Sequence, residues 1–364
     1  MARLKELAQQ LVHALGKYSH ILIYIKGSPD PDAIASSLAI KYLCDTLNVK
    51  TNIVAIKKLS LSQNKLFIRK LDIPVKITRE IEKIDKYDAY IVVDHQSAMI
   101  DHITGIIPCA AHIDHHEKSD EHIPADFRLI RKDMGSTCTI ISLLLHELNP
   151  QMSDAQKTTM ATALLFGIQT DTDKYRHASR YDYEAINYLS RYADNDIIND
   201  IAGLPMSQNT AKYLSMASDR QIIYKNWLIY GIGFIDETDR DSIAIIADFL
   251  LNRENVSVVV VYASVTGRNG KSLTLDASFR TNNDNLNLNN IIKGITPDGG
   301  ARKYKGAFQV PLDFLGVCPD RDMLWEVLNL STLESLKQQR DEILITELKG
   351  FFTKVRGTIK GIFK

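Results

Sequence analysis

The sequence has few cysteines and no surplus of charge of either sign. Its four cysteines lie far apart and form no CxxC pair, which argues against a zinc knuckle or a disulfide framework and favours buried thiols in a reducing compartment. Lysine plus arginine and aspartate plus glutamate both number 44, so net charge does not steer the chain toward nucleic acid. An anionic ligand must therefore be held by a local site.

Long hydrophobic runs are also missing. No stretch approaches the roughly 20 apolar residues that span a bilayer, and the first 18 residues alternate charged and apolar types instead of forming the apolar core of a signal peptide. We therefore expect a cytoplasmic protein. At 364 residues the chain is long for a single core, so two domains are expected.

The first half alternates strand-like and helix-like segments. Apolar runs predict strands at 20–26, 51–58, 88–94 and 109–114, with helical periodicity at 33–47, 134–148 and 153–172. This alternation predicts an α/β fold with a parallel sheet covered on both faces. A second, smaller α/β unit follows, so we expect domains at 1–195 and 221–330, a helical linker at 196–220 and a C-terminal helical extension at 331–364.

Acidic and imidazole side chains gather where the predicted strands and one helix end. The set is Asp30, Asp32, Asp94, Asp114, His115, His116 and Asp171. Ligands of parallel sheets bind at the carboxyl ends of the strands, and converging carboxylates repel one another unless a cation neutralises them. Carboxylates with imidazoles suit Mn²⁺, Mg²⁺, Fe²⁺ or Zn²⁺, and paired metals often serve phosphate-ester hydrolysis. Taken singly, each aspartate is more often a helix cap than a metal ligand, and only their joint placement at the strand ends favours a metal site.

Four ordered motifs carry a family resemblance. SPDPDAIASS (28–37), VVDH (92–95), HIDHH (112–116) and GIQTDTDKYRH (167–177) resemble the motifs of the DHH phosphoesterases. SFR (278–280) and DGGARKYKGA (298–307) resemble the associated DHHA1 substrate-binding domain. The resemblance covers roughly residues 15 to 315. Within the family, the chain is similar to bacterial oligoribonucleases that also dephosphorylate 3′-phosphoadenosine 5′-phosphate. It implies an active site in the cleft between the two domains.

The resemblance also implies roles for the clustered residues. A first metal would be held by four side chains, namely Asp32, Asp94, His115 and Asp171. Asp94 would bridge to a second metal that Asp30 also binds. His116 would lie beside the scissile phosphate as general acid or phosphate contact, and Asp114 would orient the histidines through hydrogen bonds. At Ser136 and Thr137, a helix start could direct backbone N–H groups at the phosphate or simply be capped.

Two positions depart from the family pattern. Lys26 stands where the family has a metal-binding histidine, and an ammonium cannot ligate a metal, so Lys26 would contact the phosphate instead. The glycine motif reads DGGAR and is expected to form a loop that leads into a strand, with Gly299 and Gly300 permitting close backbone approach to a ligand. Arg280 and Arg302 are candidates for gripping a second phosphate or a terminal carboxylate.

These features predict a metal-dependent hydrolase of phosphodiester or phosphomonoester bonds in short oligonucleotides or small nucleotides. We expect one or two divalent ions, Mn²⁺ foremost, and no binding of long duplex nucleic acid. The alternative is a nucleotide-binding regulator whose catalysis is weakened or lost because Lys26 replaces a ligand. The basic tail at 349–364 is expected to pack on a partner or on the protein body rather than on a membrane, and a homodimer is left open.

Overall fold

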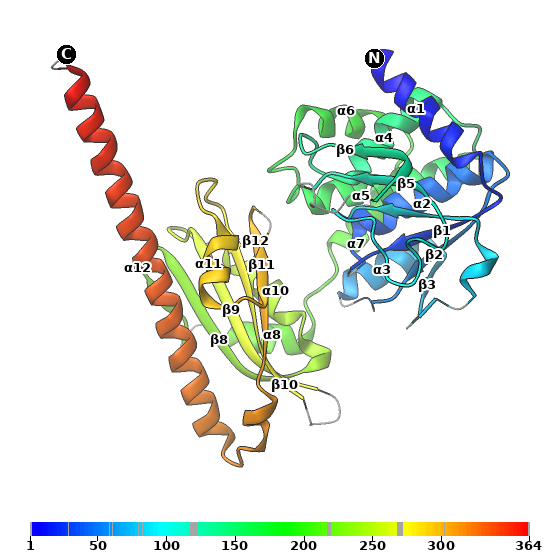
Figure 1. Ribbon diagram of the computed structural model, residues 1–364. Coiled ribbons are helices and arrows are strands. Elements are labelled where there is room, and N and C mark those ends of the chain that lie inside the picture. The colour runs from blue at the N-terminus through cyan, green and yellow to red at the C-terminus, as the bar shows by residue number, and fades with distance from the viewer. Residues whose placement is uncertain are drawn as a thin grey trace. The chain divides into compact units, whose positions relative to one another are not determined.

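The computed structural model describes residues 2–27, 29–57, 59, 61–78, 80–81, 83–116, 123–216, 220–267, 272–301 and 303–362, with side chains from residue 3 to residue 343 of those ranges. The chain divides into two compact units, Met1–Leu204 and Pro205–Lys364, and each is considered by itself (Figure 1). Within the described residues, no helix has the length and apolar character needed to cross a membrane.

The first unit is built on a parallel sheet of six strands. The strands are β1 (His20–Ile25), β2 (Lys50–Ala55), β3 (Val75–Ile77), β4 (Ala89–Val93), β5 (Cys109–Asp114) and β6 (Ala125–Ile130). Their order is β3-β2-β1-β4-β5-β6, and every neighbouring pair is parallel, which confirms the predicted α/β class. Sequence reading missed β3 and β6, the two edge strands, because neither is a fully buried apolar run.

This strand order creates a switch point between β1 and β4. From β1 the chain continues to β2 and β3 on one side, and from β4 it continues to β5 and β6 on the other. Connections that leave two neighbouring strands in opposite directions open a crevice beyond their carboxyl ends. The acidic turns after β1 and β4 therefore border the same crevice.

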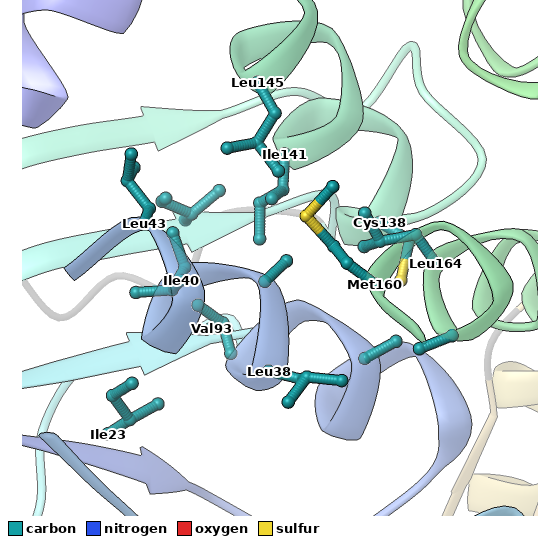
Figure 2. Close-up of a cluster of buried hydrophobic side chains, with 14 of the residues drawn as sticks. Ile23, Leu38, Ile40, Leu43, Val93, Cys138, Ile141, Leu145, Met160 and Leu164 are labelled. Carbon is teal, nitrogen blue, oxygen red and sulfur yellow. The ribbon is translucent and has the colours of Figure 1, made fainter. Parts of the chain in front are cut away.

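The helices of the first unit cover one face of its sheet. They are α1 (Ala2–Leu15), α2 (Pro31–Thr46), α3 (Ser62–Lys70), α4 (Thr137–Leu148), α5 (Asp154–Asp171), α6 (Arg180–Leu189) and α7 (Asn195–Ala202). Figure 2 shows the core between strand residues such as Ile23 and helix residues such as Leu38 and Ile141. On the opposite face, Tyr90 and Val92 pack on Ile100 of the segment after β4, so a loop covers this face where helices were expected.

The second unit has a mixed sheet of six strands. They are β7 (Ile222–Tyr224), β8 (Trp227–Asp236), β9 (Val258–Thr266), β10 (Leu273–Thr281), β11 (Gly299–Ala301) and β12 (Lys305–Pro311), in the order β11-β12-β10-β9-β8-β7. Only the β8–β9 pair is parallel. One apolar core lies under α10 (Ser242–Leu250) and α8 (Gln208–Ser215), and another under α11 (Leu288–Ile295) and α12 (Arg321–Ile362).

The predicted glycine loop was wrong. Gly299–Ala301 form β11, whose residues pair with Gly306–Phe308 of β12, so the motif is one arm of an antiparallel hairpin. Gly299 is required for packing, since a Cβ there would lie 2.3 Å from Cγ2 of Ile292. Glycines are typical of loops, but here they lie in a strand because α11 packs against it through Ile292.

A buried carboxylate ties α6 to the turn before α4. Asp182 is fully buried and accepts hydrogen bonds from the backbone N–H of Gly135, at 3.0 Å, and of Ser179, at 2.6 Å. The hydroxyl of Thr139 also donates to it. Its loss would leave several donors unsatisfied in the interior.

We expect Asp182→Ala to destabilise the first unit by about 3 kcal/mol, and Asp182→Asn by less because one acceptor oxygen remains. Both tryptophans, Trp227 and Trp325, lie in the second unit. The urea midpoint seen by far-UV circular dichroism should therefore fall, while that seen by tryptophan fluorescence stays. The control is Asp45→Ala, which removes only a surface pair with Lys41. If Asp182→Ala and Asp45→Ala lower the urea midpoint equally, Asp182 does not stabilise the first unit.

Candidate metal centre

The turn after β1 supplies two aspartates with different local roles. Asp30 is the N-cap of α2, and its carboxylate accepts the N–H of Ala33 at 2.9 Å, so capping is one of its functions. Asp32 lies in the first turn of α2 and is 1% exposed. The proline between them fixes φ for the first helical position and starts the helix at once.

The start of α4 is directed at Asp32. The backbone N–H of Thr137 donates to Oδ2 of Asp32 at 2.8 Å, and that of Cys138 donates to Oδ1 at 2.7 Å. The positive end of a helix thereby stabilises a buried carboxylate. Of the two roles that the sequence leaves open for this helix start, phosphate contact and capping, the first would need N–H groups other than these two, which bind Asp32. Ser136 caps α4 by accepting the N–H of Thr139.

Asp94 lies directly after β4 in an unusual backbone conformation. Its φ of +56° is in the left-handed region, where few residues other than glycine are found. The side chain is buried, and its Oδ1 accepts a hydrogen bond from the Thr137 hydroxyl at 3.1 Å. Two loops that are distant in sequence are thus joined to the start of α4.

His115 faces three carboxylates with one ring nitrogen. Its Nε2 is 3.0 Å from an oxygen of Asp171, 3.5 Å from Asp94 and 3.9 Å from Asp32. Its Nδ1 is 3.3 Å from the carbonyl oxygen of Met134, which can only accept and therefore places a hydrogen on Nδ1. Nε2 is buried without a properly directed hydrogen bond.

The charges at this point are strongly coupled. Burial alone would lower the pKa of His115, but its contact with Asp171 and the charges of Asp171 and Asp32 outweigh burial and raise the pKa to about 9. Burial, followed by the charge of Asp171, raises the pKa of Asp32, against the opposing effects of His115 and Cys138. The carboxylates therefore favour positive charge at this point, which a protonated His115 or a metal ion bound to its Nε2 would supply.

His116 is held by a separate acid. Its Nδ1 is 2.6 Å from Oδ1 of the fully buried Asp114, while its Nε2 is buried without a hydrogen-bond partner. Burial raises the pKa of Asp114, but the hydrogen bond and charge of His116 bring this pKa below its usual value, so Asp114 is ionised. Asp114 contacts His116 directly, whereas the Nδ1 of His115 meets the Met134 carbonyl.

The donor atoms fit a divalent metal. Two overlapping groups, Asp32–His115–Asp171 and Asp94–His115–His116, each have ligand atoms within 4.8 Å of one another. Carboxylate oxygens with imidazole nitrogen, and no thiolate, suit Mn²⁺, Fe²⁺ or Zn²⁺. The buried Nε2 of His115 aimed at three carboxylates is the observation that supports this fit. Asp30 belongs to neither group, so its role at a second ion stays a prediction.

Lys26 points its ammonium at the segment after β4. The Nζ donates to the carbonyl oxygen of Met99 at 2.6 Å and lies 3.5 Å from the hydroxyl of Ser97. A contact between Lys26 and phosphate stays a prediction, and it would require the ammonium to share its donors with this loop.

The remaining predicted residues lie in the second unit. Arg280 is 8% exposed; its guanidinium donates to both oxygens of Asp248, to the Ser278 hydroxyl and to the Phe279 carbonyl. Four of its five N–H groups are thus engaged, which leaves little for a phosphate. Gly300 is exposed on β11, and the nearest atom to a Cβ there would be Oδ1 of Asn289 at 3.7 Å, so close approach remains open. Arg302 lies outside the described residues.

Two residues position the site in ways that the sequence does not indicate. Thr137 was noted for its N–H but acts on Asp94 through its hydroxyl, and Met134 orients His115 through a carbonyl oxygen. Every residue has a carbonyl, so no sequence signal identifies the second contact.

The sequence was compared with protein families and with known proteins. Residues 20–168 match the DHH family, N-terminal domain. The uncharacterized protein MJ1633 of Methanocaldococcus jannaschii is 31% identical over 315 residues, which are 85% of this chain and 61% of that protein. The uncharacterized protein MJ0988 of the same organism is 29% identical over 179 residues, 48% of this chain and 51% of that protein. The chain therefore spans only about half to three-fifths of these relatives.

A solved structure is similar over both units. The crystal structure of an exopolyphosphatase-related protein from Bacteroides fragilis matches with a TM-score of 0.66 and 16% identity, covering 92% of this chain and 98% of that one. At this identity the likeness concerns the fold.

We expect Thr137→Val to weaken Mn²⁺ binding by about 10- to 100-fold, because the hydroxyl that orients Asp94 is lost while the N–H to Asp32 remains. Thr137→Ser should restore it. The matched control is Thr332→Val in α12, whose buried hydroxyl donates only to the Leu328 carbonyl among the described contacts. Isothermal titration calorimetry measures the affinity. Wild-type affinity in Thr137→Val would show that the hydroxyl does not position Asp94.

Proposed function

Residues 20–168 of the chain belong to the DHH family, and from this premise we propose that the protein is a divalent-metal-dependent phosphoesterase acting on short oligonucleotides or small nucleotides. The observation that carries the proposal is the buried Nε2 of His115 facing Asp32, Asp94 and Asp171. Such a site needs a cation, and a cation among carboxylates beside a second histidine suits phosphate chemistry.

The proposed division of labour follows from the contacts. Asp32, Asp94, His115 and Asp171 would hold the ion, for which Mn²⁺ is our first choice. A bound divalent ion supplies a hydroxide near neutral pH and neutralises charge on the phosphate. The helix N-terminus and the Thr137 hydroxyl keep two of the carboxylates in fixed orientations, so little reorganisation is needed on binding.

His116 is suited to proton transfer or phosphate contact. With Nδ1–H bound to Asp114, its Nε2 is the free position of the ring and has no hydrogen-bond partner. From this position the ring can contact a phosphate oxygen or pass a proton to the leaving oxygen. Asp114 would thus act through His116 rather than on the substrate.

The proposed substrate is compact. The 44 basic and 44 acidic residues leave no net positive charge to attract a long strand or duplex. The resemblance to oligoribonucleases that also act on small nucleotides points to dinucleotides, cyclic dinucleotides or nucleoside bisphosphates as the substrates to be examined.

A nucleotide-binding regulator is the second candidate, and one observation favours it. Lys26 stands where the family has a metal-binding histidine, and its ammonium group donates a hydrogen bond to the Met99 carbonyl oxygen. A second ion would therefore lack one imidazole. Under this alternative the protein binds nucleotide and metal without turnover.

With Mn²⁺ present, we expect hydrolysis of at least one of these three substrate classes, and a loss of more than about 100-fold in Asp94→Ala and His115→Ala because each removes a proposed ligand. Matched controls are Asp45→Ala on α2 and His146→Ala on the exposed side of α4. Circular dichroism checks the fold. Most activity surviving in both site variants would overturn the proposed centre, whereas binding without turnover in the wild type would favour the regulator.

A further inference from the structure

An apolar stripe is exposed at the start of α12. It comprises Phe314 and Val317 of the preceding turn η3 (Asp313–Val317) and Met323, Val327 and Leu330 of the helix. These side chains are 88%, 85%, 61%, 56% and 59% exposed, respectively. Five large hydrophobic side chains exposed within 17 residues mark an interaction surface rather than scattered surface residues.

The stripe lies on a side of α12 that does not face its own sheet. Met323, Val327 and Leu330 are spaced by four and three residues and so share one side of the helix. Leu324 and Leu328 lie on another side and are buried against Leu273. The helix is thus apolar on two sides. The described residues of its own unit cover the side of Leu324 and Leu328 and leave the side of the stripe exposed.

The charges around the stripe restrict its partner. From 313 to 334 the sequence has five acidic residues, Asp313, Asp320, Asp322, Glu326 and Glu334, and one basic residue, Arg321. Two such stripes packed on each other would bring like charges together, and an anionic lipid surface would be repelled. A basic apolar helix is the complementary partner.

The end of the same chain has that composition. Residues 349–364 contain five basic and no acidic residues. In the sequence of this tail, Phe351, Val355, Ile359 and Ile362 follow one another at spacings of four, four and three residues, a pattern typical of one apolar side of a helix. Between the stripe and the tail, Lys337 lies over the Tyr224 ring and Asp341 pairs with Lys225, so these positions bind the second unit of the same chain.

The tail cannot reach the stripe of its own chain. The backbone of α12 is one continuous helix from Arg321 to Ile362 beside the second sheet (Figure 1), about 60 Å long at 1.5 Å per residue. A helix without a break cannot fold back on its first turns, so the tail that meets this stripe belongs to another molecule.

We propose that α12 pairs in antiparallel orientation with α12 of a second copy of this chain. The acidic apolar stripe of each copy then lies along the basic apolar tail of the other, and the two contacts are related by a two-fold axis that closes the assembly as a dimer. The proposal concerns α12 alone and is independent of the proposed enzymatic function.

Sedimentation equilibrium of the full chain should give a dimer, and Val327→Glu or Leu330→Glu should raise the dissociation constant at least about 100-fold by burying a charge. The matched control is Phe249→Glu, an apolar residue 55% exposed on α10, which should remain dimeric. Lys354→Glu combined with Arg356→Glu should also weaken the dimer, most at low salt. A monomeric wild type, or a dimer that survives Val327→Glu, would overturn the proposal.

Orientation is tested by disulfide trapping in a Cys318→Ser background. Differently tagged Leu330→Cys and Val355→Cys chains should form a mixed disulfide when combined, because an antiparallel pair brings these positions together. Links between two Leu330→Cys chains would show parallel pairing and reject the antiparallel arrangement. A monomer that floats with phosphatidylserine vesicles would reject the dimer and assign the tail to a lipid surface.

Discussion

The site of the first unit depends on the electrostatic repulsion between buried carboxylates, which hydrogen bonds from the protein reduce only in part. Three carboxylates from separate loops and helices converge on the Nε2 of His115. The N-terminus of α4 stabilises Asp32 through two N–H groups, and the Thr137 hydroxyl binds Asp94. These donors compensate part of the negative charge and leave a position that favours a cation. A site prepared in this way binds a metal with little rearrangement.

Strand order places these groups together. β1 and β4 are neighbours whose connections leave in opposite directions, so the turns that carry Asp32 and Asp94 meet at one crevice. The helix α5 ends at Asp171, and β5 ends at Asp114, immediately before the two histidines. Because these positions are at or directly next to the ends of strands and helices, regular secondary structure places the candidate ligands.

The second unit uses its charges and glycines largely for its own structure. Arg280 forms a bidentate pair with Asp248, and Gly299 is pressed between Ile292 and Phe308. Arginine and glycine can serve either ligand binding or the packing of the protein's own core. The contacts of each residue in the structure show which of these roles it has. In contrast, the exposed apolar side of α12 has no such internal role among the described residues, which is why a second copy accounts for it.

The sequence by itself determined the α/β class, the central strands and the aspartates and histidines at their ends, because hydrophobic periodicity and residue type are local properties. It did not determine the edge strands β3 and β6 or the strand status of the glycine motif, since pairing with a neighbour decides these and not composition. Only the tertiary structure decided which atoms meet. The N–H group of Cys138 donates to Asp32, and that of Thr139 donates to the Ser136 hydroxyl. The Met134 carbonyl orients the ring of His115, and Lys26 donates to the Met99 carbonyl. These contacts join residues far apart in the chain or use backbone groups that every residue possesses, so composition and periodicity do not reveal them.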